Sequence, residues 1–316
     1  MGKLALNNAL SNLGAEVKPL PDYSSQVRHD IEYQRIQQLP NGLYVPKSSY
    51  LYQHSNLASE LYFDDRPGLA IGRQESRHGV MFGKLGSLAV ENFVEIVAVK
   101  PSDKPEQILG ELAILQYLQD KTSFPTFRPV AYLSNEQESY LFTEFNPDIH
   151  VLGMFDWRHA SELQKKAIIK EVSNGLGRLH ANFLYHGDAL VRNLALNSRN
   201  KFFIVDPELM VSGKDIANII YQSGLKSHQK ELLIGQLSRP MSADITSFYN
   251  SLLARAYKQS QIKTSQQILE FLTTNILQSY KEGLASGSDI KNNSLVNELY
   301  EIIEKSFRQR AEQEIL

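Results

Sequence analysis

The chain has 316 residues, a length that suits two subdomains, or one large domain with an extension, better than one small core. Its 33 basic and 35 acidic residues give a net charge of −2, which offers no basic excess for a nucleic acid. The chain contains no cysteine, so disulfides, zinc–thiolate sites, iron–sulfur clusters and cysteine nucleophiles are excluded. No signal-peptide core or transmembrane-length apolar run is present, and we expect a cytoplasmic protein that binds neither membrane nor nucleic acid.

Residues 1–66 are predicted to be an N-terminal extension of unclear role. Prolines and glycines interrupt its short apolar pieces, which argues against long helices. Residues 67–145 have a strand-rich texture and predict a small α+β domain with one helix, which begins near Ser102 or Asp103 and carries an apolar stripe. Five strands are expected in this domain, at 69–73, 79–90, 93–100, 127–133 and 140–144.

Residues 146–316 are predicted to form a mostly helical domain. A helix over 161–180 precedes two short strands, at 194–196 and 202–205, and three more amphipathic helices follow. Their apolar positions repeat at helical spacing near 245–256, 268–283 and 295–303. The sequence therefore predicts the α+β fold class, with a β-rich half before a helical half. We expect an active site in the cleft between two such halves.

The strongest candidates for chemistry are Asp188, Asn193 and Asp206. All three lie at the ends of short predicted strands, where polar side chains can project into one cleft. Asp206 directly follows four apolar residues, and a carboxylate at that junction needs a metal, a cation or hydrogen bonds, because unpaired burial is costly. Mg²⁺ prefers hard oxygen ligands, which Asn193 and Asp206 supply. Asp188 is then left to accept or orient the proton of an acceptor hydroxyl.

These residues resemble the protein-kinase-like superfamily, and within it the aminoglycoside phosphotransferase and choline kinase branch is the closest. His186, Asp188 and Asn193 match H-x-D-x-x-x-x-N, and Asp206 matches the metal-binding Asp that follows a short hairpin. The run Asp206-Pro207-Glu208 is similar to that branch's D-x-E. The resemblance implies a two-lobed fold, with a small β-rich N-lobe that has one helix and a larger helical C-lobe. It also implies ATP and Mg²⁺ as cofactors, metal ligation by Asn193 and Asp206, and a catalytic role for Asp188.

A lysine at the end of an apolar strand, Lys100, is similar to the family lysine that contacts the ATP phosphates. Glu111 falls on the apolar stripe of the predicted helix after it, and a carboxylate there needs a nearby cation. Lys100 is its natural partner, as in the family's Lys–Glu pair. Glu106 is the alternative to Glu111 as the partner of Lys100, but it lies in the first helical turn, where an acid suits the helix dipole.

The expected loop over the phosphates does not follow G-x-G-x-x-G. Either Glu75–Gly79 or Gly79–Gly86 fits as the turn, so Gly79 and Gly83 are the candidate glycines, although glycine in strands also marks bulges. By resemblance, the adenine lies against the linker between the lobes. Glu144 and Asn146 there flank the backbone groups that would bind it.

The segment after Asp206 indicates the class of acceptor. Only a short stretch precedes Asp215, which leaves no room for a peptide-binding activation segment, so a small-molecule or sugar hydroxyl is the expected acceptor. Asp215 itself is predicted to buttress the catalytic loop or to cap a helix. Leu190 stands where protein kinases usually carry a lysine and aminoglycoside kinases often carry a histidine, and Arg192 is a candidate substitute for that side chain.

The expected activity is that of a kinase with an alcohol acceptor. The alternatives are an autophosphorylating Ser/Thr protein kinase, for which a protein is the acceptor, and a non-catalytic nucleotide-binding protein.

Overall fold

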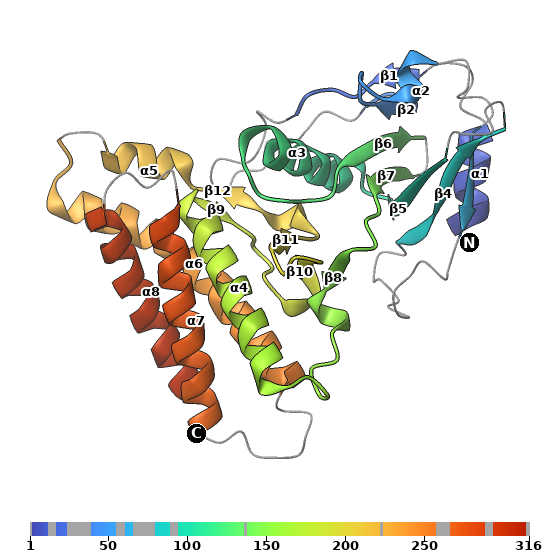
Figure 1. The fold of residues 1–316 in the computed structure, drawn as a ribbon. Coiled ribbons are helices and arrows are strands. Elements are labelled where there is room, and N and C mark those ends of the chain that lie inside the picture. Colours follow the sequence, from blue (N-terminus) through green and yellow to red (C-terminus); the bar gives the residue numbers. More distant parts are fainter. Residues whose placement is uncertain are drawn as a thin grey trace. The chain divides into compact units, whose positions relative to one another are not determined.

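The computed structural model describes ten stretches of the chain, which form two compact units, one ending at Asp148 and the other starting at Ile149 (Figure 1). The described stretches are residues 2–11, 17–23, 39–54, 61–65, 80–88, 94–135, 138–221, 224–256, 266–287 and 293–313.

The first unit is built on a seven-stranded sheet with the order β1-β2-β6-β7-β5-β4-β3. Its strands are β1 (Val17–Pro19), β2 (Gly42–Val45), β3 (Leu61–Asp65), β4 (Met81–Ser87), β5 (Val94–Ser102), β6 (Pro129–Ser134) and β7 (Ser139–Glu144). Strand β1 runs parallel to β2, and every other neighbouring pair is antiparallel.

Successive residues of a strand point to opposite faces of the sheet, and here apolar residues on both faces are buried in separate cores. Leu133 and Ala131 of β6 join a core with helices α1 (Gly2–Ser11) and α2 (Tyr50–Gln53). Tyr132, between them in sequence, joins a second core with helix α3 (Pro105–Lys121) on the opposite face. Helices therefore cover the sheet on both sides.

Residues predicted to be a separate extension belong to this same sheet. Strands β1, β2 and β3 all come from residues 1–66, and α1 packs on β3. Asn7 of α1 donates from Nδ2 to the Phe63 carbonyl (3.0 Å) and accepts from the Phe63 N–H at Oδ1 (2.7 Å). The side-chain amide thus satisfies backbone groups on an edge strand that would otherwise lie open. The strands are too short, three to five residues, to stand out against the surrounding prolines and glycines.

The second unit is mainly helical, and Figure 1 shows four of its helices lying side by side as a bundle: α4, α6, α7 and α8. The helices are α4 (Glu162–Ala181), α5 (Lys214–Tyr221), α6 (Ser227–Ala256), α7 (Gln266–Ser286) and α8 (Asn293–Gln313), with short 3-10 turns η3 (Leu152–Met154), η4 (Val191–Asn193) and η5 (Pro207–Leu209). Ser161 begins α4 with a capping box, in which Gln164 answers from the third helical position.

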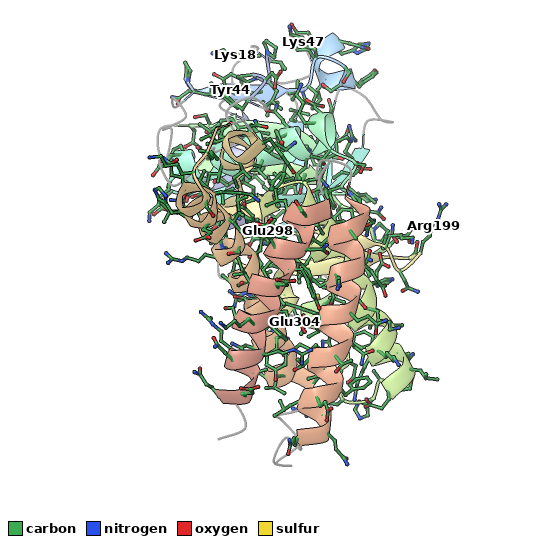
Figure 2. The ribbon with its side chains drawn as sticks, turned by 90° about the vertical axis from the view of Figure 1, so that its left-hand side faces the viewer. Lys18, Tyr44, Lys47, Arg199, Glu298 and Glu304 are labelled. Carbon is green, nitrogen blue, oxygen red and sulfur yellow. The ribbon has the colours of Figure 1, made fainter. Side chains whose placement is uncertain are left out.

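Two small sheets accompany this bundle. One has the order β11-β10-β8, and the other pairs β12 with β9. Their strands are β8 (Ile149–Val151), β9 (Leu184–Tyr185), β10 (Leu194–Asn197), β11 (Phe202–Ile204) and β12 (Val211–Ser212). On the surface of the bundle, Glu298 of α8 accepts from Lys230 of α6 at 3.0 Å, and Figure 2 labels Glu298 and Glu304 on the same helix.

The prediction of a strand-rich half before a helical half is confirmed. Strands β4 to β7, helix α3, helix α4 and the β10–β11 hairpin all occur where the sequence places them. The segment 69–73 lies outside the described residues. The structural boundary at Asp148 falls close to the predicted one after residue 145. Among the described residues, no helix combines the length and apolarity needed to span a bilayer.

Candidate functional site

His186 ties together the two segments that carry the predicted chemistry of the second unit. Its side chain is fully buried. Nε2 lies 3.3 Å from the carbonyl of Asn193 and 3.2 Å from that of Val205. Since both partners are carbonyl oxygens, Nε2 must carry the proton and donate. One imidazole therefore holds the residue before Asp206 next to Asn193.

Asn193 is fixed by Asp188, the residue predicted to accept or orient the proton of an acceptor hydroxyl. Its Nδ2 donates to the backbone carbonyl of Asp188 at 3.0 Å and to Asp188 Oδ2 at 2.7 Å. Because the amide nitrogen faces two acceptors, the amide oxygen Oδ1 must point the other way, which leaves a hard oxygen for a cation. Arg192 also reaches Asp188 Oδ2, at 3.3 Å from Nη2. Within the described residues, no donor lies on Asp188 Oδ1.

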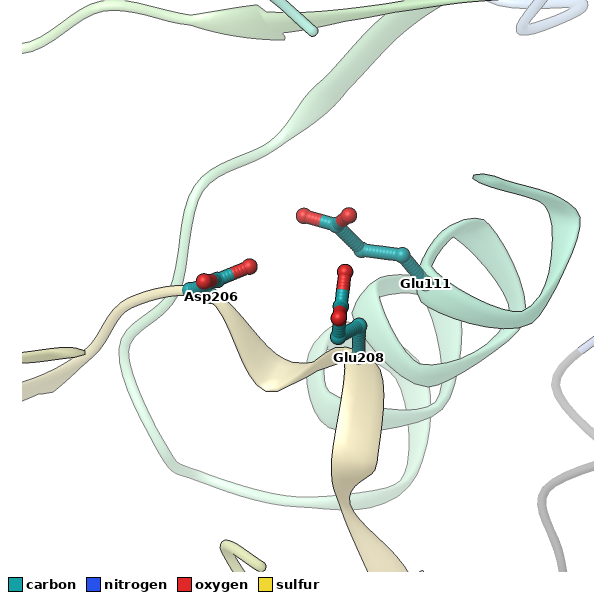
Figure 3. Close-up of side chains that lie close together, drawn as sticks. All are labelled: Glu111, Asp206 and Glu208. Carbon is teal, nitrogen blue, oxygen red and sulfur yellow. The ribbon is translucent and has the colours of Figure 1, made fainter. Parts of the chain in front are cut away.

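Asp206 and Glu208 supply two carboxylates from one turn. One oxygen of each lies within 4.8 Å of the other, and Figure 3 shows both side chains leaving the chain around η5. Asp206 has φ 51° and ψ 61°, the left-handed conformation that side chains disfavour. Such strain persists only where the surroundings enforce it, and it gathers at functional sites. The oxygens of Asp206, Glu208 and Asn193 are all of the hard type that Mg²⁺ prefers.

Gly187 allows the two segments to pack closely. Its φ is 79°, and a Cβ at this position would collide with the backbone carbonyl of Leu209 at the end of η5. Only glycine meets both conditions without strain. The turn that carries Asp206 and Glu208 can therefore rest directly against the chain beside Asp188.

A buried carboxylate on α6, Asp244, holds the backbone of the loop that contains His186, Gly187 and Asp188. Its Oδ2 accepts from the His186 N–H at 2.6 Å and its Oδ1 from the Gly187 N–H at 2.9 Å. His180 Nε2 donates to Oδ2 at 3.1 Å, and His180 Nδ1 lies 2.9 Å from the Tyr280 hydroxyl. Burial, reinforced by the charge of Asp244, raises the pKa of Tyr280 well above its ordinary value, so its O–H remains to donate. Tyr280, His180 and Asp244 thus form one chain of hydrogen bonds that ends on the loop.

The sequence did not single out Asp244 as an anchor. Asp215, expected to buttress the catalytic loop or cap a helix, lies exposed in the first turn of α5, and Asp244 holds the backbone N–H groups of His186 and Gly187. The signal for Asp244 was present, since it lies on the same helical stripe as Ile245, Phe248 and Leu252. A carboxylate among buried apolar positions needs donors, by the reasoning that singles out Glu111.

In the first unit, the predicted Lys100–Glu111 ion pair is present. Lys100 Nζ donates to Glu111 Oε2 at 2.7 Å, and the two side chains are only 14% and 9% exposed. Val97 and Val99 point to the core of α1, so Lys100 projects from the other face of β5, where α3 lies. Figure 3 shows Glu111 projecting from α3. Glu106, the alternative partner, is exposed in the first turn of that helix.

The linker residues use their side chains locally. Glu144 accepts from Arg128 Nε at 3.0 Å, and the Glu144 N–H donates to the Arg128 carbonyl at 2.8 Å. Asn146 Oδ1 accepts from the Asp148 N–H at 2.9 Å. These contacts fix the backbone at the end of β7.

The glycines of the expected phosphate loop divide between two regions. Gly79 lies outside the described residues, as does the whole Glu75–Gly79 alternative. Gly83 lies inside β4, paired with Asp65 and Val97, so Gly79–Gly86 is not a turn. A Cβ on Gly83 would collide with the Asp64 carbonyl and the Phe63 ring, and this packing accounts for the glycine.

A scan against protein-family models finds no match to the chain, and a search of curated proteins finds none with significant similarity.

Proposed function

We propose that this chain is a kinase that transfers the γ-phosphate of ATP to a hydroxyl group of a small molecule or sugar. The observation that carries the proposal is the arrangement around His186, which holds Asn193, Asp188 and the strained Asp206 in one polar cluster. A base, an amide oxygen and a carboxylate in that order are what the resemblance to the kinase-like superfamily implies for phosphoryl transfer.

The metal-binding residues of this proposal are Asn193 and Asp206, with Glu208 beside them. Their oxygens are suitable ligands for Mg²⁺, and the Asn193 amide is already oriented by Asp188. Held by these residues, Mg²⁺ would supply positive charge to neutralise the phosphates during transfer. Asp206 is held for this task by its left-handed backbone and by the His186 contact to the preceding carbonyl.

Asp188 orients the nucleophile. Its Oδ2 is occupied by Asn193 and Arg192, which leaves Oδ1 to accept the hydrogen bond of an acceptor hydroxyl. In the transfer, the acceptor oxygen bonds to the γ-phosphorus while the bond from phosphorus to the ADP oxygen breaks. The hydroxyl proton passes to Asp188. Positioning and electrostatics supply most of the catalysis in such reactions.

Lys100 and Glu111 complete the proposal in the first unit. In protein kinases the phosphate-contacting lysine lies on the third strand and pairs with a glutamate of the next helix. Here β3, β4 and β5 are successive antiparallel neighbours, and Lys100 lies on the third of them. A two-lobed, protein-kinase-like arrangement is part of the proposal, with the adenine against the backbone at Glu144 and Asn146.

A small acceptor is favoured over a protein by the segment after Asp206. It forms η5 and the two-residue strand β12, and α5 already begins at Lys214. No residues are left for an extended peptide-binding platform in this stretch. A nucleotide-binding role without catalysis is the second candidate, because Leu190 is neutral at the position where protein kinases carry a lysine.

The test is a pair of conservative variants. Asp206→Asn is expected to abolish transfer and to weaken binding of Mg²⁺ and ATP in a thermal-shift titration, because it removes a charged ligand. Asp188→Asn is expected to abolish transfer but leave that binding largely intact. Asp120→Asn, which changes an exposed acid on α3, is the matched control. Transfer at the wild-type rate by Asp188→Asn would show that the assignment is wrong, and nucleotide binding without transfer to any acceptor by the wild type would favour the second candidate.

A further inference from the structure

The side chain of Arg192 lies on the open side of the catalytic turn. Within η4, Val191 and Asn193 are buried, whereas the Arg192 side chain is 40% exposed and Asp188 is 33% exposed. The turn is fixed at its start by the Val191 N–H, which donates to Ser251 Oγ at 3.1 Å. Any side chain at position 192 therefore shares the exposed face of Asp188.

The contact between Arg192 and Asp188 uses little of what the guanidinium offers. It is a single hydrogen bond of 3.3 Å, long for a charge-assisted pair. The same oxygen already accepts from Asn193 at 2.7 Å, so Asp188 does not depend on the arginine. An exposed ion pair of this kind contributes little to stability. A guanidinium has five N–H donors, and the described residues accept only this one hydrogen bond from Arg192.

An arginine with most of its donors unused, fixed beside a proposed base, is suited to a planar or tetrahedral anion. Carboxylates and phosphates accept two parallel hydrogen bonds from the guanidinium fork. We propose that Arg192 binds an anionic group of the acceptor, so that the substrate is an alcohol carrying a carboxylate or phosphate near its hydroxyl. This inference rests on the proposed function, since it assumes that the acceptor hydroxyl meets Asp188 Oδ1.

The geometry also limits the acceptor's size. Arg192 and the acceptor hydroxyl are held by neighbouring groups, one on Asp188 Oδ2 and the other on Oδ1. The anion and the hydroxyl of the substrate must then lie only a few bonds apart. Hydroxy acids and phosphorylated polyols meet this condition, whereas neutral sugars offer the guanidinium no charged partner.

The experiment compares matched anionic and neutral alcohols. D-glycerate and glycerol 3-phosphate are each compared with glycerol, and gluconate is compared with glucose. Binding is measured by calorimetry in the presence of Mg²⁺ and a non-hydrolysable ATP analogue, and transfer by ADP release with ATP. We expect wild-type protein to bind at least one anion about 10- to 100-fold more tightly than its neutral partner, the range expected for a bidentate charge-assisted contact.

The variants identify the responsible residue. Arg192→Gln should lose this preference, so that the ratio of the two affinities falls from about 10- to 100-fold to about one. Arg192→Lys, which keeps the charge but not the fork, should retain part of it. Arg199→Gln removes an exposed arginine from the β10–β11 turn, labelled in Figure 2, and should behave as wild type.

Two results would overturn the inference while leaving the proposed function intact. One is wild-type protein that binds no anion better than its neutral partner. The other is an Arg192→Gln variant that slows transfer to both kinds of alcohol equally, which would place the arginine on the transferred phosphate. Failure of the proposed function would look different, because the wild type would then either not bind the ATP analogue with Mg²⁺, or bind it and transfer phosphate to none of the alcohols, anionic or neutral.

Discussion

Replacing Asp244 should loosen the loop that contains His186 and Asp188 without changing any residue of the proposed site. The carboxylate accepts from two successive backbone N–H groups, those of His186 and Gly187, and from His180 Nε2. It is 2% exposed, so water cannot replace a lost acceptor. Gly187 directly precedes Asp188, and loss of its anchor should therefore reach the proposed base.

The expected size comes from counting these hydrogen bonds. A bond to a charged group contributes about 1.5–3 kcal/mol net, and a buried donor without a partner costs about 1–3 kcal/mol. Asp244→Asn can keep its oxygen at the Oδ2 position and lose the Gly187 bond, so we expect a loss of about 2–3 kcal/mol. Asp244→Ala abandons all three donors and should cost roughly 3–5 kcal/mol.

The assay is unfolding in urea at neutral pH, read as the midpoint at unchanged slope, together with the rate of ADP release. Asp120→Asn is the control, since an exposed acid on α3 should change stability by no more than about 0.5 kcal/mol. Equal stabilities for Asp244→Asn and Asp120→Asn would refute the reasoning. So would an Asp244→Asn protein with full catalytic rate, because the loop would then not depend on its anchor.

Two further predictions concern buried charge. Lys100→Met removes a 2.7 Å hydrogen bond from the buried Glu111 carboxylate and should destabilise the protein by about 1.5–3 kcal/mol. Lys100→Met combined with Glu111→Leu should cost less in urea unfolding than the two single changes added together, because they share one ion pair, and both proteins should lose nucleotide affinity. Because the pKa of Tyr280 is raised, its folding contribution is complete below the unfolded value of about 10 and is lost as pH rises toward the folded value. Stability should therefore fall less steeply above about pH 10 in Tyr280→Phe than in wild type, measured by urea unfolding across that range; identical slopes would contradict this.

Periodicity predicted the regular elements that are long or strongly patterned. Helix α4 carries both an apolar stripe and a capping box, and strand β5 is a nearly continuous apolar run. The strands of residues 1–66 escaped prediction because each is short and stabilised by distant partners. Strand β2, for example, pairs with β6, which follows α3 in the sequence, and local pattern does not reveal such a distant pairing.

The candidate site was predictable where residue type and spacing coincide with an element boundary. Lys100 and Glu111 could be paired because the face of a helix and the end of a strand can be read from pattern alone. The same kind of pattern marks Asp244 as a buried acid that needs donors, but it does not say which donors the carboxylate meets. Asp244 lies far from the loop in sequence, and only the packing of α6 brings its carboxylate beneath the His186 and Gly187 N–H groups.

Backbone strain gives an argument for this site that does not depend on any resemblance. Among the described residues, three non-glycine positions have positive φ: Phe183, Asn200 and Asp206. Asn200 lies in the β10–β11 turn, where asparagine is well tolerated. The other two flank the loop of His186 and Asp188, and neither a bulky aromatic nor a residue before proline favours this conformation. Strain of roughly 1–3 kcal/mol at each is retained only where the surrounding structure enforces it. Hydrogen bonds fix the chain beside both residues: Asp244 holds the His186 and Gly187 N–H groups, and His186 holds the Val205 carbonyl next to Asp206.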